Sequence, residues 1–410
     1  MGAFTRCLLI ASVAGPCLAA DITATLSAAP EWRTDNTNSA YFVGPPLASP
    51  QDRAARQDLG LRVQEGGFNA QGTLRIQAQQ GQTPERHGIV NQFYYDGEID
   101  AGNGWTAGRK VMTWGVGFGF RPLDVVQRED RRNPNPAPLV GVPLLAWEPF
   151  SADEALTLAW TRPGGGNGTA DGEDAALAAH WYRLTPGGTD LHAVARISRR
   201  NALEAGAGFS RTVGEEWSFH AAALNQARYA KTLNLLAENG GGLLSAAPPL
   251  QATPRRNALK AVAGVQWTES SGIGVLVEGW YDGEAYSREE WQRLNGLTAA
   301  QRALTGLAPQ AAIDGNVGWS SQAAFGRPNL LRENLLARLS YDAEQRWTYA
   351  LEWLATPRDG GRAVTMNMTY QGNRQRLSGG VRFLGGAGDS ALAQAPFKRI
   401  VWFEWRLALP

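Results

Sequence analysis

Segments in which apolar and polar side chains alternate recur along most of this chain of 410 residues. In the last of them, residues 400–409, Phe403 and Trp405 fall on one face, and Glu404 and Arg406 fall on the other. A period of two is typical of β-strands, whose successive side chains point to opposite faces of a sheet. The pattern therefore predicts an all-β protein whose strands have one apolar face and one polar face.

The spacing of these segments predicts where the strands lie. We place strands near 21–33, 58–68, 72–80, 88–98, 104–116, 142–150, 154–162, 174–185, 189–199, 202–213, 215–224, 258–268, 272–283, 329–342, 345–355, 362–371, 375–385 and 398–409. The weakest of them is 142–150, because proline cannot donate a ladder hydrogen bond and this segment contains Pro143.

The links between these strands alternate in length. Links after the even-numbered strands are brief, as at 69–71 and 101–103. Most links after the odd-numbered strands are long, notably 34–57, 117–141, 163–173, 225–257, 284–328 and 386–397. Short turns on one rim and long loops on the other are the arrangement of outer-membrane barrels. The predicted fold is a transmembrane antiparallel up-and-down β-barrel of about 18 strands, or roughly 16–20 if a hairpin is miscounted.

The first 20 residues have the features of a cleaved export signal. Arg6 is basic, residues 7–14 are apolar, and the small residues Ala19 and Ala20 offer a cleavage site. Lipidation at Cys17 is a weaker alternative, because Pro16 precedes it where a small residue is preferred. Both cysteines lie in this segment, so the mature chain, residues 21–410, is expected to have no disulfide and no thiolate.

Composition excludes some partners and favours others. Lys+Arg 39 against Asp+Glu 38 is nearly balanced, which predicts no nucleic-acid partner. Trp 15 is generous, and tryptophan is enriched where a protein meets lipid headgroups. No later segment is long and apolar enough for a membrane-spanning helix. We therefore expect the protein to lie in the outer membrane of a Gram-negative cell. Its expected partners are membrane lipid, lipopolysaccharide and the barrel-assembly machinery.

One of the long loops has a helical pattern. Ser287 and Glu290 form a capping box at the start of residues 287–304. Asn295 and Gly296 interrupt the pattern, which predicts two short helices in a surface loop. Residues 225–257, rich in Leu, Gly and Pro, are expected to form a mobile or folded-in loop.

The segment from 104 to 150 is the least generic part of the chain. Its strand runs into a charged, proline-rich loop that is the third of the long-side loops. At this position general porins fold a loop inward and narrow the pore. We therefore predict that loop 117–141 is the pore constriction.

A resemblance supports this interpretation. Gly-Arg-Lys-Val and Trp-Gly within 108–115, Arg-Pro-Leu-Asp at 121–124, a basic stretch and Gly-Val-Pro-Leu-Leu at 141–145 follow in order. This order resembles outer-membrane porin-like proteins of the alginate-export and related uncharacterised-porin type. The resemblance implies an 18-stranded monomeric pore for an anionic or hydrophobic solute. The chain departs from that type in having fewer inward arginines than a polyuronate conduit would need.

The charged residues expected to face the lumen are mostly basic. The predicted pore-lining and constriction residues are Arg109, Arg121, Asp124, Arg128, Arg131, Arg132, Lys260, Arg332, Arg338, Arg376, Arg382 and Arg406. Guanidinium groups along a constriction favour anions. In the alternative, some of these arginines, with Arg75 and Arg196, pair with Glu278, Glu352 and Glu404 into ladders that stiffen the wall.

The chain shows no catalytic or metal-binding pattern. His87, His180, His192 and His220 have no metal-ligand spacing, and no serine or carboxylate completes a catalytic relay. We expect no enzyme activity, no cofactor and no metal. The predicted function is passive passage of a small anionic solute. The alternative is a barrel that acts in surface binding or envelope assembly through the outer loops 225–257 and 284–328.

Overall fold

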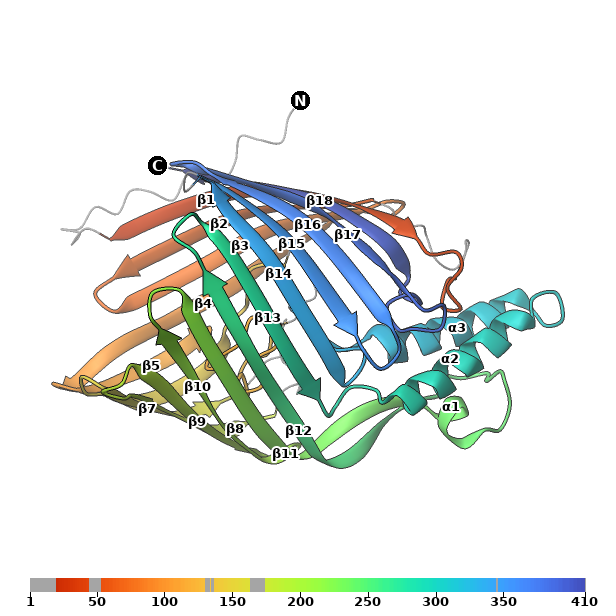
Figure 1. The fold of residues 1–410 in the computed structure, drawn as a ribbon, viewed down its shortest axis with the longest axis horizontal. Helices are drawn as coiled ribbons and strands as arrows, with labels where there is room; N and C mark the ends of the chain where they lie inside the picture. Colours follow the sequence, from red (N-terminus) through yellow and green to blue (C-terminus); the bar gives the residue numbers. More distant parts are fainter. Residues whose placement is uncertain are drawn as a thin grey trace.

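The computed structural model describes residues 20–43, 53–129, 133, 136–162, 174–343 and 346–409. In this part of the chain, 18 antiparallel strands form one closed barrel (Figure 1). The strands are β1 (Asp21–Asp35), β2 (Arg53–Glu65), β3 (Phe68–Gln79), β4 (Glu85–Asp100), β5 (Asn103–Lys110), β6 (Val142–Pro149), β7 (Glu154–Thr161), β8 (Ala176–Leu184), β9 (Thr189–Ser198), β10 (Ala202–Val213), β11 (Trp217–Asn234), β12 (Leu250–Thr268), β13 (Ile273–Asp282), β14 (Glu333–Ala343), β15 (Trp347–Thr356), β16 (Gly361–Gln371), β17 (Gln375–Gly386) and β18 (Phe397–Leu409). The predicted fold class is confirmed.

The barrel closes by pairing of its first and last strands. β1 and β18 are antiparallel neighbours, with Ala24 opposite Leu409 and Trp32 opposite Val401. Every other strand pairs with the strands before and after it in sequence. Closure leaves no unpaired sheet edge, which a strand structure surrounded by lipid requires.

The two rims differ as the link lengths predict. The short-turn rim has connections such as 66–67, 101–102 and 372–374. β1 begins and β18 ends at this rim (Figure 1). The long-loop rim carries 111–141 and 283–332. The predicted loop 163–173 lies outside the described residues, as do 44–52 of the predicted loop 34–57.

The predicted loop 225–257 is wrong in extent. β11 and β12 continue to Asn234 and from Leu250, so only residues 235–249 connect them. The alternation is broken near Asn257, which has a positive φ of 57°. Beyond that point Tyr229 and Lys231 face inward, whereas Leu224 and Gln226 do so below it. A strand whose faces exchange midway loses its period of two in the sequence.

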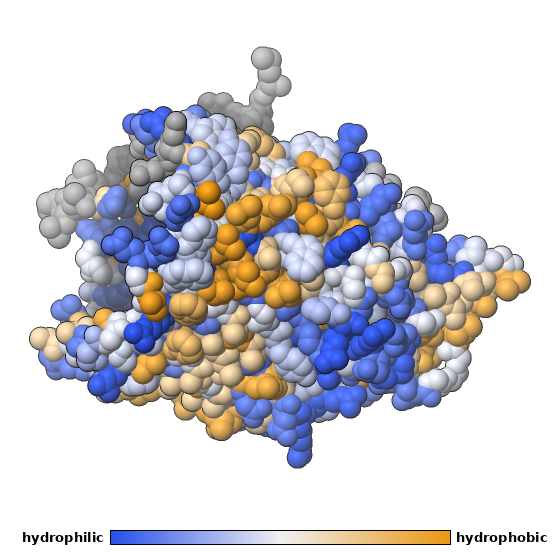
Figure 2. Space-filling model, in the orientation of Figure 1, coloured by the Kyte–Doolittle hydropathy of each residue, from blue (hydrophilic) through white to orange (hydrophobic). Residues whose placement is uncertain are grey.

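The outer face of the barrel is apolar. Large exposed side chains such as Leu177, Val277, Leu339 and Phe403 point outward. In Figure 2 hydrophobic residues cross the middle of the wall, and hydrophilic residues gather toward the rims. Aromatic rings meet at the short-turn rim in the pairs Trp217 with Trp267, Trp347 with Tyr370 and Tyr95 with Trp105. An apolar band bordered by an aromatic girdle is the surface of a membrane-spanning barrel.

Three helices stand on the long-loop rim (Figure 1): α1 (Leu235–Asn239), α2 (Arg288–Ala303) and α3 (Gln310–Phe325). The capping box of Ser287 and Glu290 is confirmed, but α2 is continuous, so the predicted break is wrong. A Cβ at Gly296 would meet nothing within 4 Å, and this glycine therefore only weakens the helix. None of the helices in the described residues combines the length and apolar composition needed to cross a membrane.

Candidate pore constriction

Loop 111–141 joins β5 to β6, and its described residues, 111–129, 133 and 136–141, fold into the barrel. Leu123 is completely buried, and Val125 and Val126 are nearly so. They form one apolar cluster with Trp114 of the same loop and with inward side chains of β6–β14. The loop therefore covers this part of the inner wall and leaves free space against the strands that follow.

Glycines in the wall make room for the loop. A Cβ on Gly206 would lie 3.0 Å from Cδ2 of Leu123, and a Cβ on Gly208 would lie 3.1 Å from its Cδ1. Ala222 is also small and belongs to the same buried cluster. Small wall residues opposite a large loop side chain give the close packing of a protein interior.

A buried carboxylate fastens the loop to the wall. Glu278 of β13 is fully buried and accepts hydrogen bonds from the backbone N–H groups of Phe118 (2.6 Å), Gly119 (2.8 Å) and Phe120 (3.2 Å). Its Oε2 also lies 2.8 Å from Nε2 of His220. Because a carboxylate only accepts hydrogen bonds, these donors satisfy it and hold the loop at one depth.

Two side chains of the loop hold its own backbone. Oδ1 of Asp124 accepts hydrogen bonds from the N–H groups of Trp114 (2.7 Å) and Gly115 (2.6 Å). Gln127 accepts from the N–H of Met112 and donates to the carbonyl of Val140. Asp124 was predicted as a pore-lining charge; its carboxylate mainly caps the loop, although the residue borders the lumen cavity.

A charged network holds the outer end of the loop. Nη2 of Arg128 lies 3.0 Å from Oε1 of Glu204, and Nη1 lies 3.5 Å from Oε2 of Glu284. Nζ of Lys260 lies 2.9 Å from Oε1 of Glu284. Burial raises the pKa of Glu284, but the charges of Lys260 and Arg128 outweigh this effect and bring the pKa to about 2. Glu284 is therefore ionised at physiological pH.

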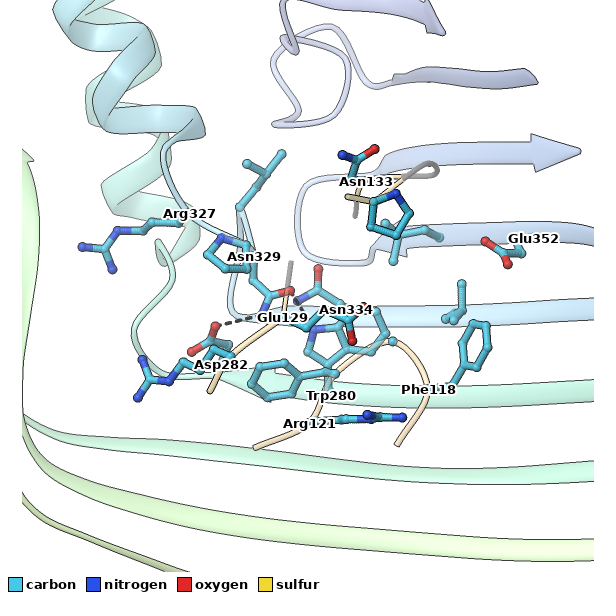
Figure 3. Close-up of a pocket in the computed structure, with 18 of the residues that line it drawn as sticks. Phe118, Arg121, Glu129, Asn133, Trp280, Asp282, Arg327, Asn329, Asn334 and Glu352 are labelled. Atoms are coloured by element: carbon cyan, nitrogen blue, oxygen red, sulfur yellow. Dashed lines mark hydrogen bonds between the residues drawn. The ribbon is translucent and has the colours of Figure 1, made fainter. Parts of the chain in front are cut away.

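A cavity of about 1070 Å³ lies between the loop and the wall formed by β12–β17 (Figure 3). Phe118, Arg121 and Glu129 border it from the loop, and Trp280 and Glu352 border it from the wall. Its charged lining residues in the described part of the chain are Arg121, Asp124, Arg128, Glu129, Lys260, Asp282, Glu284, Arg327, Arg338, Glu352, Arg376 and Arg382. Seven of these are basic and five are acidic, so cations prevail.

The cations of the far wall differ in how they are held. Nη1 of Arg338 lies 2.6 Å from Oε1 of Glu352, and its Cζ stands 5.1 Å from the ring centroid of Phe118. Nε of Arg382 donates to Oγ1 of Thr365 at 2.7 Å. Arg376 forms no ion pair with a described residue. Among the described residues, the guanidinium group of Arg376 is thus not neutralised by a neighbouring carboxylate.

Most of the predicted lining residues meet at this cavity. Those that border it are Arg121, Asp124, Arg128, Lys260, Arg338, Arg376 and Arg382. Arg406 is opposite Arg376 in the β17–β18 register, on the same face. Arg332 lies at the long-loop rim, where it binds Oε2 of Glu290 in α2 at 3.4 Å. Arg131 and Arg132 lie outside the described residues.

The prediction that Arg109 faces the lumen is wrong. It stands opposite Phe93 in the β4–β5 register, and Phe93 is exposed on the outer face. Its Nη1 donates to the carbonyl of Gly141 near the long-loop rim. A long cationic side chain near a rim reaches polar groups while its stem stays in lipid, so charge alone does not fix its face.

The alternative in which arginines stiffen the wall also holds for part of the barrel. Asp58 binds Arg75 at 2.8 Å and Arg56 at 3.3 Å. Glu404 binds Arg406 at 3.1 Å and lies 3.9 Å from Arg56. These five side chains form a continuous ladder across β2, β3 and β18. The basic excess is therefore divided between a paired ladder and the cavity.

The histidines have structural contacts. Nε2 of His180 lies 3.1 Å from Nδ1 of His192, and Trp114 of the loop stacks on His180 with ring centroids 5.2 Å apart. No group of three or more His, Cys, Asp or Glu that could hold a metal ion occurs among the described residues.

Several lining residues were not predicted. Arg327 and Asn329 belong to the segment between α3 and β14, and no periodic pattern marks that segment. Trp280 and Asp282 could have been found, because they share the inward face of β13 with Glu278.

Comparisons with known proteins place the fold but not the family. No family model matches the sequence, and no curated protein matches it. Among solved structures, Pseudomonas aeruginosa OccK11 (OpdR) covers 95% of this chain and 96% of its own length, with TM-score 0.55 and 8% identity. P. aeruginosa OccK8 (OprE) covers 95% and 97%, with TM-score 0.52 and 10% identity.

A third similar structure is Wzi, an outer-membrane protein of Escherichia coli involved in group 1 capsule assembly and described as a carbohydrate-binding β-barrel. It covers 94% of this chain and 84% of its own length, with TM-score 0.50 and 10% identity. At these identities the likeness concerns the fold alone. The chain thus has the fold of the outer-membrane porin and channel barrels, and the narrower resemblance to the alginate-export type stays a prediction.

Proposed function

We propose that this barrel conducts a small anionic solute passively across the outer membrane, with loop 111–141 as its constriction. The observation that carries the proposal is the cavity between the loop and the wall, with its excess of basic residues. Guanidinium groups around a narrow passage lower the energy of an anion there and raise that of a cation.

The constriction residues have distinct roles in this proposal. Arg338, Arg376 and Arg382 attract the solute, and Arg121 faces them from the loop. Arg128 and Lys260 keep the loop in place through Glu284. Arg131 and Arg132, which lie outside the described residues, are kept as pore-lining candidates on the basis of their sequence position alone. In this proposal residues 1–20 are a signal peptide that is removed during export. Passive passage of the solute requires no cofactor.

Reversal potentials in planar bilayers under a gradient of potassium chloride test the ion preference. A chloride-selective potential supports the proposal, and a potassium-selective one contradicts it. Liposome swelling with sugars, carboxylates and phosphates then identifies the solute class, and faster entry of carboxylates or phosphates than of sugars of equal size is expected.

A second candidate function is surface binding through the long-loop rim. It is favoured by the packed cap that Trp291 and Leu294 of α2 form with Tyr41 and Phe325. At the far end of this cap Leu307 is 82% exposed. Replacing residues 288–325 with a short linker separates the functions, because a pore keeps or increases its conductance, whereas a surface binder loses its ligand.

A further inference from the structure

An apolar groove of about 440 Å³ runs along the outer face of β7–β10. Its sides are the exposed side chains of Leu177, Ile197 and Leu203. Its floor includes Ala179 and Ala195, which stand directly opposite each other in the β8–β9 register. Two small residues between larger ones make a concave strip on a wall that is elsewhere covered by large side chains.

The groove opens at the long-loop rim. Ile197 is one residue from the end of β9, and Leu177 and Leu203 are the second residues of β8 and β10. In barrels of this kind the long loops lie outside the cell. The groove therefore reaches the headgroup level of the outer leaflet.

Four arginines, the rim cluster, stand at the open end of the groove: Arg199, Arg200, Arg228 and Arg256. The first two form the turn between β9 and β10. Nη2 of Arg228 donates to the carbonyl of Arg199 at 2.9 Å, which fixes the third against that turn. All four are exposed, and none of their guanidinium groups forms an ion pair with a described residue. One carboxylate lies beside them, because Oδ2 of Asp174 accepts a hydrogen bond from the backbone N–H of Arg200 at 2.8 Å.

Arg228 and Arg256 are an unfavourable pair as they stand. They are directly opposite in the β11–β12 register. Tyr229, the next residue, is buried toward the interior, so both arginines face outward. Like charges directly across two strands repel each other. An anion between them would remove the repulsion.

The rim of the barrel is lower at β9 and β10 than at β11, and this difference places Arg228 beside the turn between β9 and β10. β11 continues to Asn234, whereas β9 ends at Ser198 and the turn to β10 spans only 199–201. The hydrogen bond from the N–H of Arg228 to the carbonyl of Asn201, at 3.1 Å, shows that Arg228 stands beside this turn. The arginines are thus a cationic corner directly above an apolar groove.

We propose that the groove and the rim cluster bind a phosphorylated, acylated glycolipid of the outer leaflet. Its phosphate groups contact the four arginines, whose planar guanidinium groups suit phosphate oxygens. One of its acyl chains lies in the groove over Ala179 and Ala195. This site is separate from the lumen and does not depend on conduction.

The test uses the mature barrel, refolded in detergent and freed of lipid, with diphosphoryl lipid A as the probe. Native mass spectrometry measures the lipid retained. The variant Arg199→Gln/Arg228→Gln/Arg256→Gln is expected to retain at least about tenfold less, as is expected for lost charge-assisted contacts. Ala195→Phe, which fills the groove, should have a similar effect; Ala195→Leu replaces it if folding fails.

Arg211→Gln is the matched control. Arg211 is an exposed arginine on β10, opposite the outward Phe219 and near the other rim. It should retain as much lipid as the unaltered protein. Phosphatidylcholine, which has acyl chains but no net charge, should bind weakly to every variant.

Each alternative result overturns the proposal. If the triple variant retains as much lipid as the unaltered protein, the arginines do not bind its phosphate groups. If the groove-filling variants retain as much lipid, the groove does not hold an acyl chain. If inorganic phosphate displaced diphosphoryl lipid A as effectively as free diphosphoryl lipid A does, the arginines would bind simple anions and the acyl chain would contribute nothing. Formation of dimers that Ala195→Phe abolishes, with no lipid bound, would assign this face to a second copy of the chain.

Discussion

Replacing Glu278 with glutamine is expected to release loop 111–141 from the barrel wall. The two carboxylate oxygens accept three backbone N–H groups of the loop, at 2.6, 2.8 and 3.2 Å. Glutamine keeps one acceptor oxygen, and its amide nitrogen turns a donor toward other donors. Depending on how the amide is oriented, either the bond from Phe118 or the bonds from Gly119 and Phe120 are lost, so at least one bond disappears.

The size of the effect follows from the bonds lost. A hydrogen bond to a charged group contributes about 1.5–3 kcal/mol, so one lost bond shifts the loop equilibrium roughly 10- to 150-fold toward release. Single-channel recording should show visits to a state of larger conductance that are more frequent by that factor. Gly206 and Leu123 still pack together, so the barrel itself should remain folded.

Glu404→Gln is the control for this experiment. Glu404 is also an inward carboxylate, but it binds Arg406 and contacts no described residue of the loop. Its replacement should leave the conductance states unchanged. If Glu278→Gln and Glu404→Gln both behave like the unaltered protein, the carboxylate does not hold the loop and this explanation of the constriction is wrong.

Three further predictions concern the wall and the cavity. Replacing Arg338, Arg376 and Arg382 together with glutamine should move the reversal potential toward that of an unselective pore; an unchanged potential would place the selectivity elsewhere. Gly206→Val should prevent stable folding, seen as loss of the compact band in unheated gels, because its Cβ would lie 2.3 Å from the carbonyl oxygen of Ala223. Gly385→Val is the control, since a Cβ there meets nothing within 4 Å. The pKa of Glu284, about 2, lies below the ordinary 4.5, so its stabilisation is complete above pH 4.5 and is lost as the pH falls to 2. Glu284→Gln should lower the melting temperature at neutral pH and remove that part of the acid dependence; a variant with unaltered acid dependence would contradict the assignment.

The alternation of side chains was sufficient to predict the barrel and the inward position of Lys260 and Glu278. These predictions succeed because lipid outside and polar space inside impose one periodic rule on every strand. The rule fails where a residue leaves that environment. Arg109 lies close to a rim, and Asn257 interrupts the alternation with its positive φ.

The rest depended on contacts between distant segments. The N-cap residue of helix α3, Pro309, makes no capping hydrogen bond, and the helix includes Gly315 and Gly318, so local signals for it are weak. Arg327 reaches the cavity only because the chain after α3 turns back toward the lumen. Glu278 accepts the hydrogen bonds of the loop backbone from 158–160 residues away in sequence. No local pattern encodes a contact between such distant residues.

Conductance of the refolded protein in a planar bilayer tests the central claim most directly. The account predicts discrete steps of current, with chloride carrying more of it than potassium. If the protein migrates as a folded barrel in an unheated gel and inserts into the bilayer, yet gives no current at any potential, the proposal that this barrel is a pore is contradicted.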